Sequence, residues 1–334
     1  MRVKTTLRRS APSLLVTSLL FGNLLGAETI KPYPPGTVLE NIAISSAGDL
    51  FVTSLLEGII YKVSPSGASL VFGQVPGELA GIAFGTDGTL VGAGQKSFYQ
   101  FAPDGTSSLV TNVSSAGYLN GVTPFRPDTF LVADDGAATI WKIDLSTRSA
   151  SEWLVHDLLA APPNGLPIGA NGIKLFRGAA YISNTGAETI VRVPIVAGGA
   201  AGAPEVYASS IAADDFAFGA DGSVFATTQT GFLFRLHPDG TRTTIPTGTL
   251  GDAALAFGRT AADRQHIYVV NNGGAFFNLP GGPQAATILR LGTDTTGVVP
   301  ETQAVPEPET VFVTGAGFAV MLLLSKRCSR NHAR

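Results

Sequence analysis

The feature that most constrains this chain is a unit of about forty residues that recurs six times between residues 36 and 300. Each copy holds an apolar strand, a turn, a second strand, and a third strand that often ends in Pro-Asp-Gly. The second copy shows the whole pattern, with AGIAFG, TDG, TLVGAG and SFYQFAPDG over residues 80–105. Val-, Ile-, Phe- and Tyr-rich strands of period two fit a partly buried sheet. Six such units predict an all-β fold, a six-bladed β-propeller with four-stranded blades around a central channel.

The turns between the strands support this fold. Proline sets φ for the first corner of a turn and glycine takes the positive φ that closes it, as at 103–105 and 238–240. A weak helical pattern appears at 151–161. The repeats leave room for one disc, residues 28–300, and no second domain. Two segments could supply the strand that closes the ring, 37–40 or 295–299.

The N-terminus has the pattern of a secretory signal. Four basic residues in the first nine precede an apolar run and the small residue Ala27. This order predicts a signal peptide over residues 1–27 that is removed after export. A retained membrane anchor is the alternative, although thirteen interrupted apolar residues are short for a bilayer.

The C-terminal residues 301–334 combine a Pro-Glu-Pro triplet at 306–308, an apolar stretch at 311–324 and a basic end. A short hydrophobic helix followed by cations is expected to stop in a membrane with its charges on the cytoplasmic side. The tail resembles the PEP-CTERM sorting signal of Gram-negative-type bacteria that make exopolysaccharide. The resemblance implies cleavage by an exosortase and release to the envelope, the cell surface or the medium. A plain C-terminal anchor is the alternative.

Composition excludes several classes of site. The single cysteine, Cys328, lies in the basic tail, so the propeller region has no disulfide, thiolate metal site or cysteine nucleophile. Residues 28–305 contain 14 Lys and Arg against 23 Asp and Glu, a net charge of −9. Such an acidic body repels phosphate backbones, so no nucleic-acid partner is expected. No G-x-S-x-G elbow and no glycine-rich phosphate loop is present.

Aligning the copies on their first strand brings one position of each into register. These positions, spaced by 40, 40, 51, 43 and 39 residues, are Glu40, Ala80, Asn120, Asn171, Asp214 and Ala253. The first strand of a propeller blade is innermost, so we expect them to form a ring at the mouth of the channel. Four of the six carry side-chain oxygens.

Two carboxylates and two amides that converge on one axis are typical ligands of a hard cation. The sequence therefore predicts a divalent-cation site formed by Glu40, Asn120, Asn171 and Asp214. Since the ring holds neither Cys nor His, Ca²⁺ is favoured, with Mg²⁺, Mn²⁺ or Zn²⁺ as alternatives. The competing interpretation is that Asn-Gly pairs at 120 and 171 are ordinary turn elements.

Over the propeller region the sequence resembles the gluconolactonase/regucalcin (senescence marker protein, luciferin-regenerating enzyme-like) family of six-bladed propellers. The matching motifs are short: LENIAIS, LNGVTPF, ANGIKLF and ADDFAFGADG. The resemblance implies the same four residues as ligands of one cation in the channel. The family's Glu-Gly/Ser-Pro-x-Trp opening is Glu40-Asn41-Ile42-Ala43-Ile44 here, and its fifth-blade Asp-Gly is Asp214-Asp215. The ligand positions agree, whereas the walls that would contact a substrate differ.

Two functions of different classes follow. The first is a metal-dependent lactonase or esterase, in which the resemblance makes Asp214 the general base and Asp215 raises its proton affinity. The second is a non-catalytic surface propeller that binds or scaffolds material in an exopolysaccharide-associated envelope, with the cation only tying blades together. A propeller similar to the NHL repeat proteins would not need the four-oxygen ring. The sequence does not specify the substrate, the ion or the oligomeric state.

Overall fold

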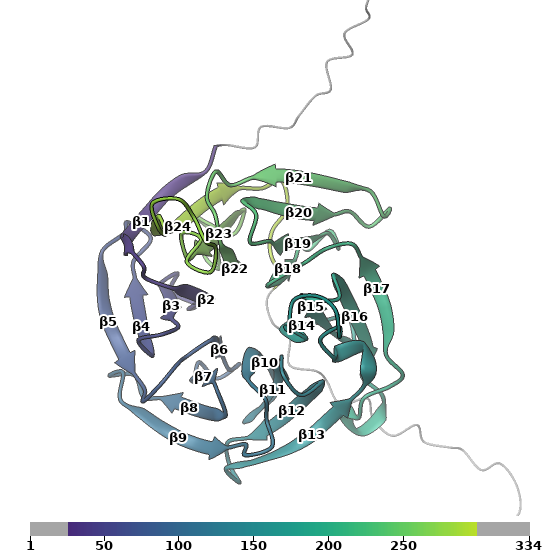
Figure 1. Ribbon diagram of the computed structural model, residues 1–334. Coiled ribbons are helices and arrows are strands. Elements are labelled where there is room, and N and C mark those ends of the chain that lie inside the picture. The colour runs from purple at the N-terminus through teal and green to yellow at the C-terminus, as the bar shows by residue number, and fades with distance from the viewer. Residues whose placement is uncertain (1–25, 299–334) are drawn as a thin grey trace, which may run out of the picture.

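The computed structural model describes residues 26–298, and these form a closed disc of six four-stranded antiparallel sheets around one axis (Figure 1). This confirms the predicted all-β, six-bladed β-propeller. The segments predicted to be signal peptide and sorting tail lie almost entirely outside the described residues. Within residues 26–298 there is no helix long and apolar enough to span a bilayer.

Each blade is numbered by the order of its innermost strand along the chain. Blade 1 comprises β2 (Leu39–Ile44), β3 (Leu50–Ser54), β4 (Ile59–Val63) and β5 (Ser69–Gln74). Blade 2 comprises β6 (Gly81–Phe84), β7 (Leu90–Gly94), β8 (Ser97–Phe101) and β9 (Ser107–Asn112). Blade 3 comprises β10 (Leu119–Arg126), β11 (Thr129–Asp134), β12 (Thr139–Asp144) and β13 (Ser149–Val155).

The second half of the disc repeats this order. Blade 4 comprises β14 (Ala170–Phe176), β15 (Ala179–Asn184), β16 (Thr189–Pro194) and β17 (Glu205–Ser209). Blade 5 comprises β18 (Phe216–Phe218), β19 (Val224–Thr227), β20 (Phe232–Leu236) and β21 (Arg242–Pro246). Blade 6 comprises β22 (Asp252–Phe257), β23 (His266–Asn271), β24 (Ala285–Gly292) and the N-terminal β1 (Glu28–Pro35).

The strand that closes the ring is β1, which pairs antiparallel with β24 as the outer strand of blade 6. Both sequence-based alternatives were wrong: Leu39 and Glu40 belong to the inner strand β2, and residues 295–298 lie elsewhere. β1 contains three prolines, which lack the N–H that a central strand needs. An edge strand tolerates them, because one of its sides has no ladder to complete.

The segment after β24 crosses to the inner edge of blade 5. Gly297 forms an isolated antiparallel bridge with Gly219 at the end of β18, and the Val298 N–H donates to the Phe218 carbonyl at 3.1 Å. Thr295 is buried at the same place. We call residues 295–298 the inner strap, since they lie beside the innermost strand rather than on the rim.

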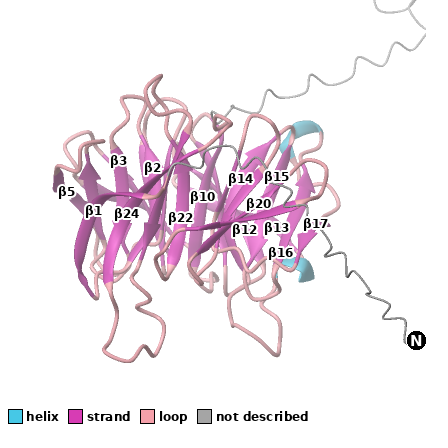
Figure 2. Ribbon diagram, turned by 90° about the horizontal axis from the view of Figure 1, so that it is seen from above, coloured by secondary structure: helices cyan, strands magenta, loops and turns pink. Residues whose placement is uncertain are grey.

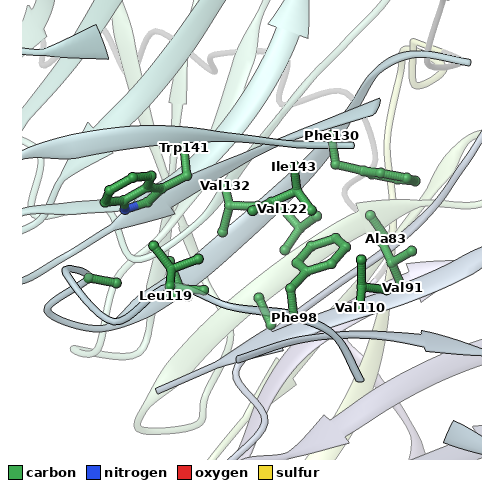
Figure 3. Packing of buried hydrophobic residues seen from close by; sticks show 13 residues of the cluster. Ala83, Val91, Phe98, Val110, Leu119, Val122, Phe130, Val132, Trp141 and Ile143 are labelled. Carbon is green, nitrogen blue, oxygen red and sulfur yellow. The ribbon is translucent and has the colours of Figure 1, made fainter. Parts of the chain in front are cut away.

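The core is divided among the contacts between blades. The buried side chains of residues 26–298 form six clusters, and each joins two neighbouring blades, including blade 6 with blade 1. Figure 3 shows the cluster between blades 2 and 3, where Phe98 faces Phe130 with ring centroids 5.9 Å apart. Every blade therefore depends on both neighbours for the burial of its apolar faces.

Loops gather at two opposite faces of the disc (Figure 2). We call the face where inner strands begin the entry face and the other the exit face. The weak helix predicted at 151–161 is absent. Residues 149–155 form β13, and one 3-10 turn, Asp157–Leu159, follows on the entry face. A second such turn, Ala197–Gly199, lies on the exit face.

Candidate functional site

The six ring positions share one backbone feature at the entry-face end of the inner strands. In blades 1, 3, 4 and 6 the ladder between the inner and second strand shifts register around the ring residue. In blade 2 the ring residue Ala80 immediately precedes β6, and in blade 5 Asp214 and Asp215 both pair with Thr227 just ahead of β18, so two residues again oppose one. A β-bulge bends the strand and redirects a side chain, and bulges are common beside functional sites.

The glycines of the two Asn-Gly pairs are required for space rather than for a turn. Neither Gly121 nor Gly172 has a positive φ, and both lie within strands. A Cβ atom on Gly121 would stand 2.4 Å from the carbonyl oxygen of Asn171, and one on Gly172 would stand 2.5 Å from Asp215 Oδ1. The inner strands of blades 3, 4 and 5 thus approach each other too closely for any side chain, so ordinary turn chemistry does not account for these pairs.

Buried hydroxyl groups hold the inner strands together at the same level. Thr227 on β19 accepts from the Asp215 N–H at 3.0 Å and lies 2.9 Å from the Ala253 carbonyl of blade 6. Ser183 on β15 makes the equivalent bonds to Gly172 N and Asp214 O at 2.8 and 3.0 Å. Thr53 does the same between blades 1 and 2. Each hydroxyl satisfies backbone groups that the bulge leaves unpaired.

All four predicted ligands are almost completely buried polar side chains. Glu40, Asn120, Asn171 and Asp214 are 9, 7, 4 and 7% exposed. Asn171 Nδ2 donates to Asp214 Oδ1 at 2.6 Å, which joins blades 4 and 5 directly. A buried carboxylate without a compensating cation is costly, so the arrangement is one that an ion would stabilise.

The other two members of the set are linked to Asp214 through electrostatics. Burial raises the pKa of Glu40 well above its ordinary value, and the charges of Asp214, Asp135 and Asp215 raise it further. Burial raises the pKa of Asp135 to about 6, and the nearby amide of Asn120 lowers it. The ring residues of blades 1, 3, 4 and 5 therefore lie in one electrostatic neighbourhood.

Asp214 is the most constrained carboxylate of the ring. Gln229 Nε2 donates to Asp214 Oδ2, and Asn171 holds the other oxygen. Burial raises the pKa of Asp214 to about 7, against the lowering effect of these two donors, and the charges of Asp215 and Asp135 also raise it. The predicted influence of Asp215 is present, but burial is the larger cause.

Asp215 has a partner that the sequence did not indicate. Lys174 Nζ on β14 lies 2.5 Å from Asp215 Oδ1, and the two side chains are 27 and 5% exposed. The pair crosses from blade 4 to blade 5 just beyond the ring. Asp215 is therefore an ion-pair partner of Lys174. Of the two adjacent acids Asp214 and Asp215, only Asp214 belongs to the ring.

Sequence alignment of the repeats missed the polar residues that come from entry-face loops. These are Asp135, Gln229, Asn272 and Tyr118. Asn272 Nδ2 is 3.4 Å from Gln229 Oε1, and the Tyr118 hydroxyl donates to Glu78 at 2.8 Å. The loops differ in length and share no repeat pattern, although the acidic pair Asp134-Asp135 at a strand end was a signal that could have been followed.

The donor set fits a hard divalent cation. It offers carboxylate and amide oxygens with no thiolate or imidazole, which is the chemistry that Ca²⁺ and Mg²⁺ select. Within residues 26–298 no three His, Cys, Asp or Glu side chains form a group placed to hold a metal. The predicted ligand set is not such a group, because two of its four members are asparagine amides. The raised pKa values of Glu40 and Asp214 indicate that these two carboxylates lack a positively charged partner.

The fold places this chain among the six-bladed β-propellers, and several solved structures resemble it. The calcium-binding regucalcin of Agrobacterium tumefaciens is 17% identical over 83% of this chain and 98% of its own, with a TM-score of 0.66. A luciferin-regenerating enzyme is 13% identical over 83 and 98%, with a TM-score of 0.68. A gluconolactonase of Xanthomonas campestris is 16% identical over 80 and 89%, with a TM-score of 0.62.

At such identities the likeness establishes a shared fold. No family model and no curated protein sequence matches the chain.

Proposed function

We propose that this chain is an exported, divalent-cation-dependent hydrolase of the lactonase or esterase type. The observation that carries the proposal is the ring of Glu40, Asn120, Asn171 and Asp214, buried at one channel mouth with two carboxylates of raised pKa. The similarity in fold to a gluconolactonase and a calcium-binding regucalcin supports it. Ca²⁺ is the favoured ion, with Mg²⁺, Mn²⁺ or Zn²⁺ as alternatives.

The bound cation would polarise the carbonyl of an ester or lactone and acidify water beside it. Glu40 and Asp214 supply the negative charge that holds the ion, and Asn120 and Asn171 supply neutral oxygens. Asp214 is also the proposed general base. Asn171 and Gln229 fix the positions of its two oxygens, so that it could accept a proton from water held beside the ion.

The entry-face loops favour a substrate with an apolar part. The loop between β23 and β24 begins at Asn272, which contacts Gln229 beside the ring, and it exposes Phe276 and Phe277 by 60 and 39%. Exposed aromatic side chains next to a polar site commonly contact a ligand. We therefore propose an ester or lactone that carries a hydrocarbon group rather than a sugar lactone.

The test is hydrolysis of a panel of lactones and aryl esters by the purified protein, with and without chelator. We expect turnover that chelation abolishes and Ca²⁺ restores. Asp214→Asn should reduce kcat/KM by about 100-fold or more, in the range expected for a general base. The control is Asp239→Asn, at an exposed turn, which should leave the rate unchanged.

Full activity in Asp214→Asn would remove the proposed role of this residue. Binding of the cation without turnover of any substrate in the panel would favour the second candidate, a non-catalytic propeller in an exopolysaccharide-associated envelope. The observation that favours this candidate is the Asn171–Asp214 bond, because it links two blades whether or not catalysis occurs. In that case Glu40→Gln would lower the melting temperature and change no reaction.

Export follows from the sequence pattern of the two ends and remains part of the proposal. The predicted signal peptide (1–27), the Pro-Glu-Pro motif and the short membrane helix would bring the chain to an exosortase at the membrane. Mass spectrometry of the protein recovered from its native host tests this. We expect a mature chain that begins near Glu28 and lacks the basic residues after 325.

A further inference from the structure

On the exit-face side of the ring, the central channel contains a cavity. Its volume is about 180 Å³, and the later residues of all six inner strands line it. The lining is mostly apolar, with Ile42, Ile82, Val122, Leu175, Phe218 and Leu255 among its members. An apolar cavity of roughly 150 Å³ in another protein stays dry and binds benzene. The space here is thus large enough for a molecule the size of a single aromatic ring.

The Lys174–Asp215 pair lies at the end of the cavity nearest the ring. Lys174 lines the cavity, whereas neither Asp215 nor any of the four predicted ligands does. On the side of blades 5 and 6, the inner strap forms part of the wall through Gly297 and Val298. A Cβ atom on Gly297 would stand 2.2 Å from Phe257 Cβ, so the strap is closely packed there. The cavity thus borders the candidate hydrolytic site, through Asn41 beside Glu40, without including any of its four predicted ligands.

The charged groups that line this apolar space are both cations. One is Lys174, whose ammonium has three N–H donors and is paired with Asp215 at one of them. The other is Arg259, which is exposed and donates from Nη1 to the Ile44 carbonyl at 3.1 Å. No Asp or Glu is part of the lining, and within residues 26–298 Arg259 forms no ion pair. A guanidinium with donors left over is a good partner for a carboxylate.

From the apolar walls, the size and the two cations, we infer that the exit half of the channel is a binding site for a small hydrophobic monocarboxylate. The hydrocarbon part would lie against the inner strands, and the carboxylate would meet Arg259 at the exit-face end, since Lys174 is already paired with Asp215. This site requires neither the cation of the ring nor any hydrolysis. It would therefore persist if the proposed function were wrong.

Isothermal titration calorimetry of the chelator-treated full-length protein tests the inference, with benzoate as the probe and benzyl alcohol as its neutral analogue. We expect benzoate to bind at one site and benzyl alcohol to bind more weakly. Ala217→Leu places a larger side chain on the lining and should weaken benzoate by at least about tenfold. Ala203→Leu, at an exposed loop position, is the matched control and should bind as the wild type does.

Arg259→Gln separates the two parts of the inference. Loss of one charge-assisted bond should weaken benzoate by about tenfold and leave benzyl alcohol unchanged. If Ala217→Leu does not fold, Val298→Phe extends the lining from the strap and provides the same test. Absence of benzoate binding, or binding that both lining variants leave intact, would overturn the inference. Equal affinity for the two probes would overturn its carboxylate part.

Discussion

The two ends of the inner strands differ although the same six segments form both. At the entry face, four ring positions carry buried oxygens and most of the strands are bulged. At the exit face the same strands continue as Ile, Val, Leu and Phe around an apolar cavity. The Lys174–Asp215 pair lies between these two regions.

This difference teaches how a propeller keeps polar groups in its interior. The bulge removes ladder bonds at the ring level, and side-chain hydroxyls from the second strands replace them. The backbone N–H and C=O groups at the ring level thus find hydrogen-bond partners nearby, and the six clusters between blades remain apolar. Four predictions test whether the boundary between the two regions depends on these specific groups, beginning with the largest effect.

The largest effect is expected at the boundary itself. Lys174→Met keeps the aliphatic stem and leaves Asp215 as a buried charge without its partner. Loss of one partner of a buried pair costs about 3–5 kcal/mol, and we expect about 3 because Lys174 is 27% exposed. Urea unfolding measures it. The double variant Lys174→Met/Asp215→Asn should regain most of the loss, and a double variant as unstable as the single one would contradict the assignment.

The second prediction concerns the entry end alone. Glu40→Gln removes one of two ring carboxylates, and its Ca²⁺ affinity should fall by more than about 100-fold, since even outer partners of metal ligands cost 10–100-fold. Ile44→Val, four residues further along the same strand, should leave Ca²⁺ affinity unchanged. Titration calorimetry compares them. Equal Ca²⁺ affinities in the two variants would mean that the cation binds elsewhere.

The third prediction concerns the hydroxyls that support the bulges. Thr227→Val leaves the Asp215 N–H and the Ala253 carbonyl without their shared partner. A buried unsatisfied group costs about 1–3 kcal/mol, so we expect a loss of about 2 kcal/mol in urea unfolding. Thr29→Val on the exposed edge strand β1 is the control and should change little. A neutral Thr227→Val would mean that the bulge is satisfied without the hydroxyl.

The fourth prediction concerns the dependence of stability on pH. Burial raises the pKa of Asp214 to about 7 and that of Asp135 to about 6. Between about pH 4 and 7 the folded protein therefore holds protons that the unfolded chain has released. The contribution of these two groups should therefore destabilise the cation-free protein progressively as the pH rises from about 4 toward 7.

Cation binding should have the opposite trend, because the ion must displace these protons. Ca²⁺ affinity is expected to rise between pH 5 and 7 by up to about tenfold per pH unit for each proton displaced. Melting curves with chelator and calorimetry at several pH values measure the two trends. Asp214→Asn should flatten both, and an unchanged profile would assign them to other groups.

Much of the fold was predictable because the same strand pattern occurs six times in the sequence. Six copies of a pattern of apolar strands specify six blades, and the spacing of the first strands aligned residues such as Asn171 and Asp214 that do touch in space. The same alignment placed all four ring residues at buried positions. The identity of the cation and its binding are still predictions.

The features that the sequence did not reveal are those without a repeat. β1 precedes the first copy and is rich in proline, so nothing marked it as the closing strand. Asp135 and Gln229 lie on loops of unequal length, and their relation to the ring depends on how the blades are placed around the axis. The Lys174–Asp215 pair joins residues 41 apart, and no local pattern couples them.

The pairing of β1 with β24 closes the disc with its first and last strands in the sequence. One contact of this pairing joins Glu28 to Arg290, 262 residues apart. During synthesis the first strand must wait, without a neighbour, until the last one has emerged. Long-range pairing of this kind is slow. Deletion of β1 or of β24 would consequently open the same seam in blade 6, so that the two deletions would have similar effects.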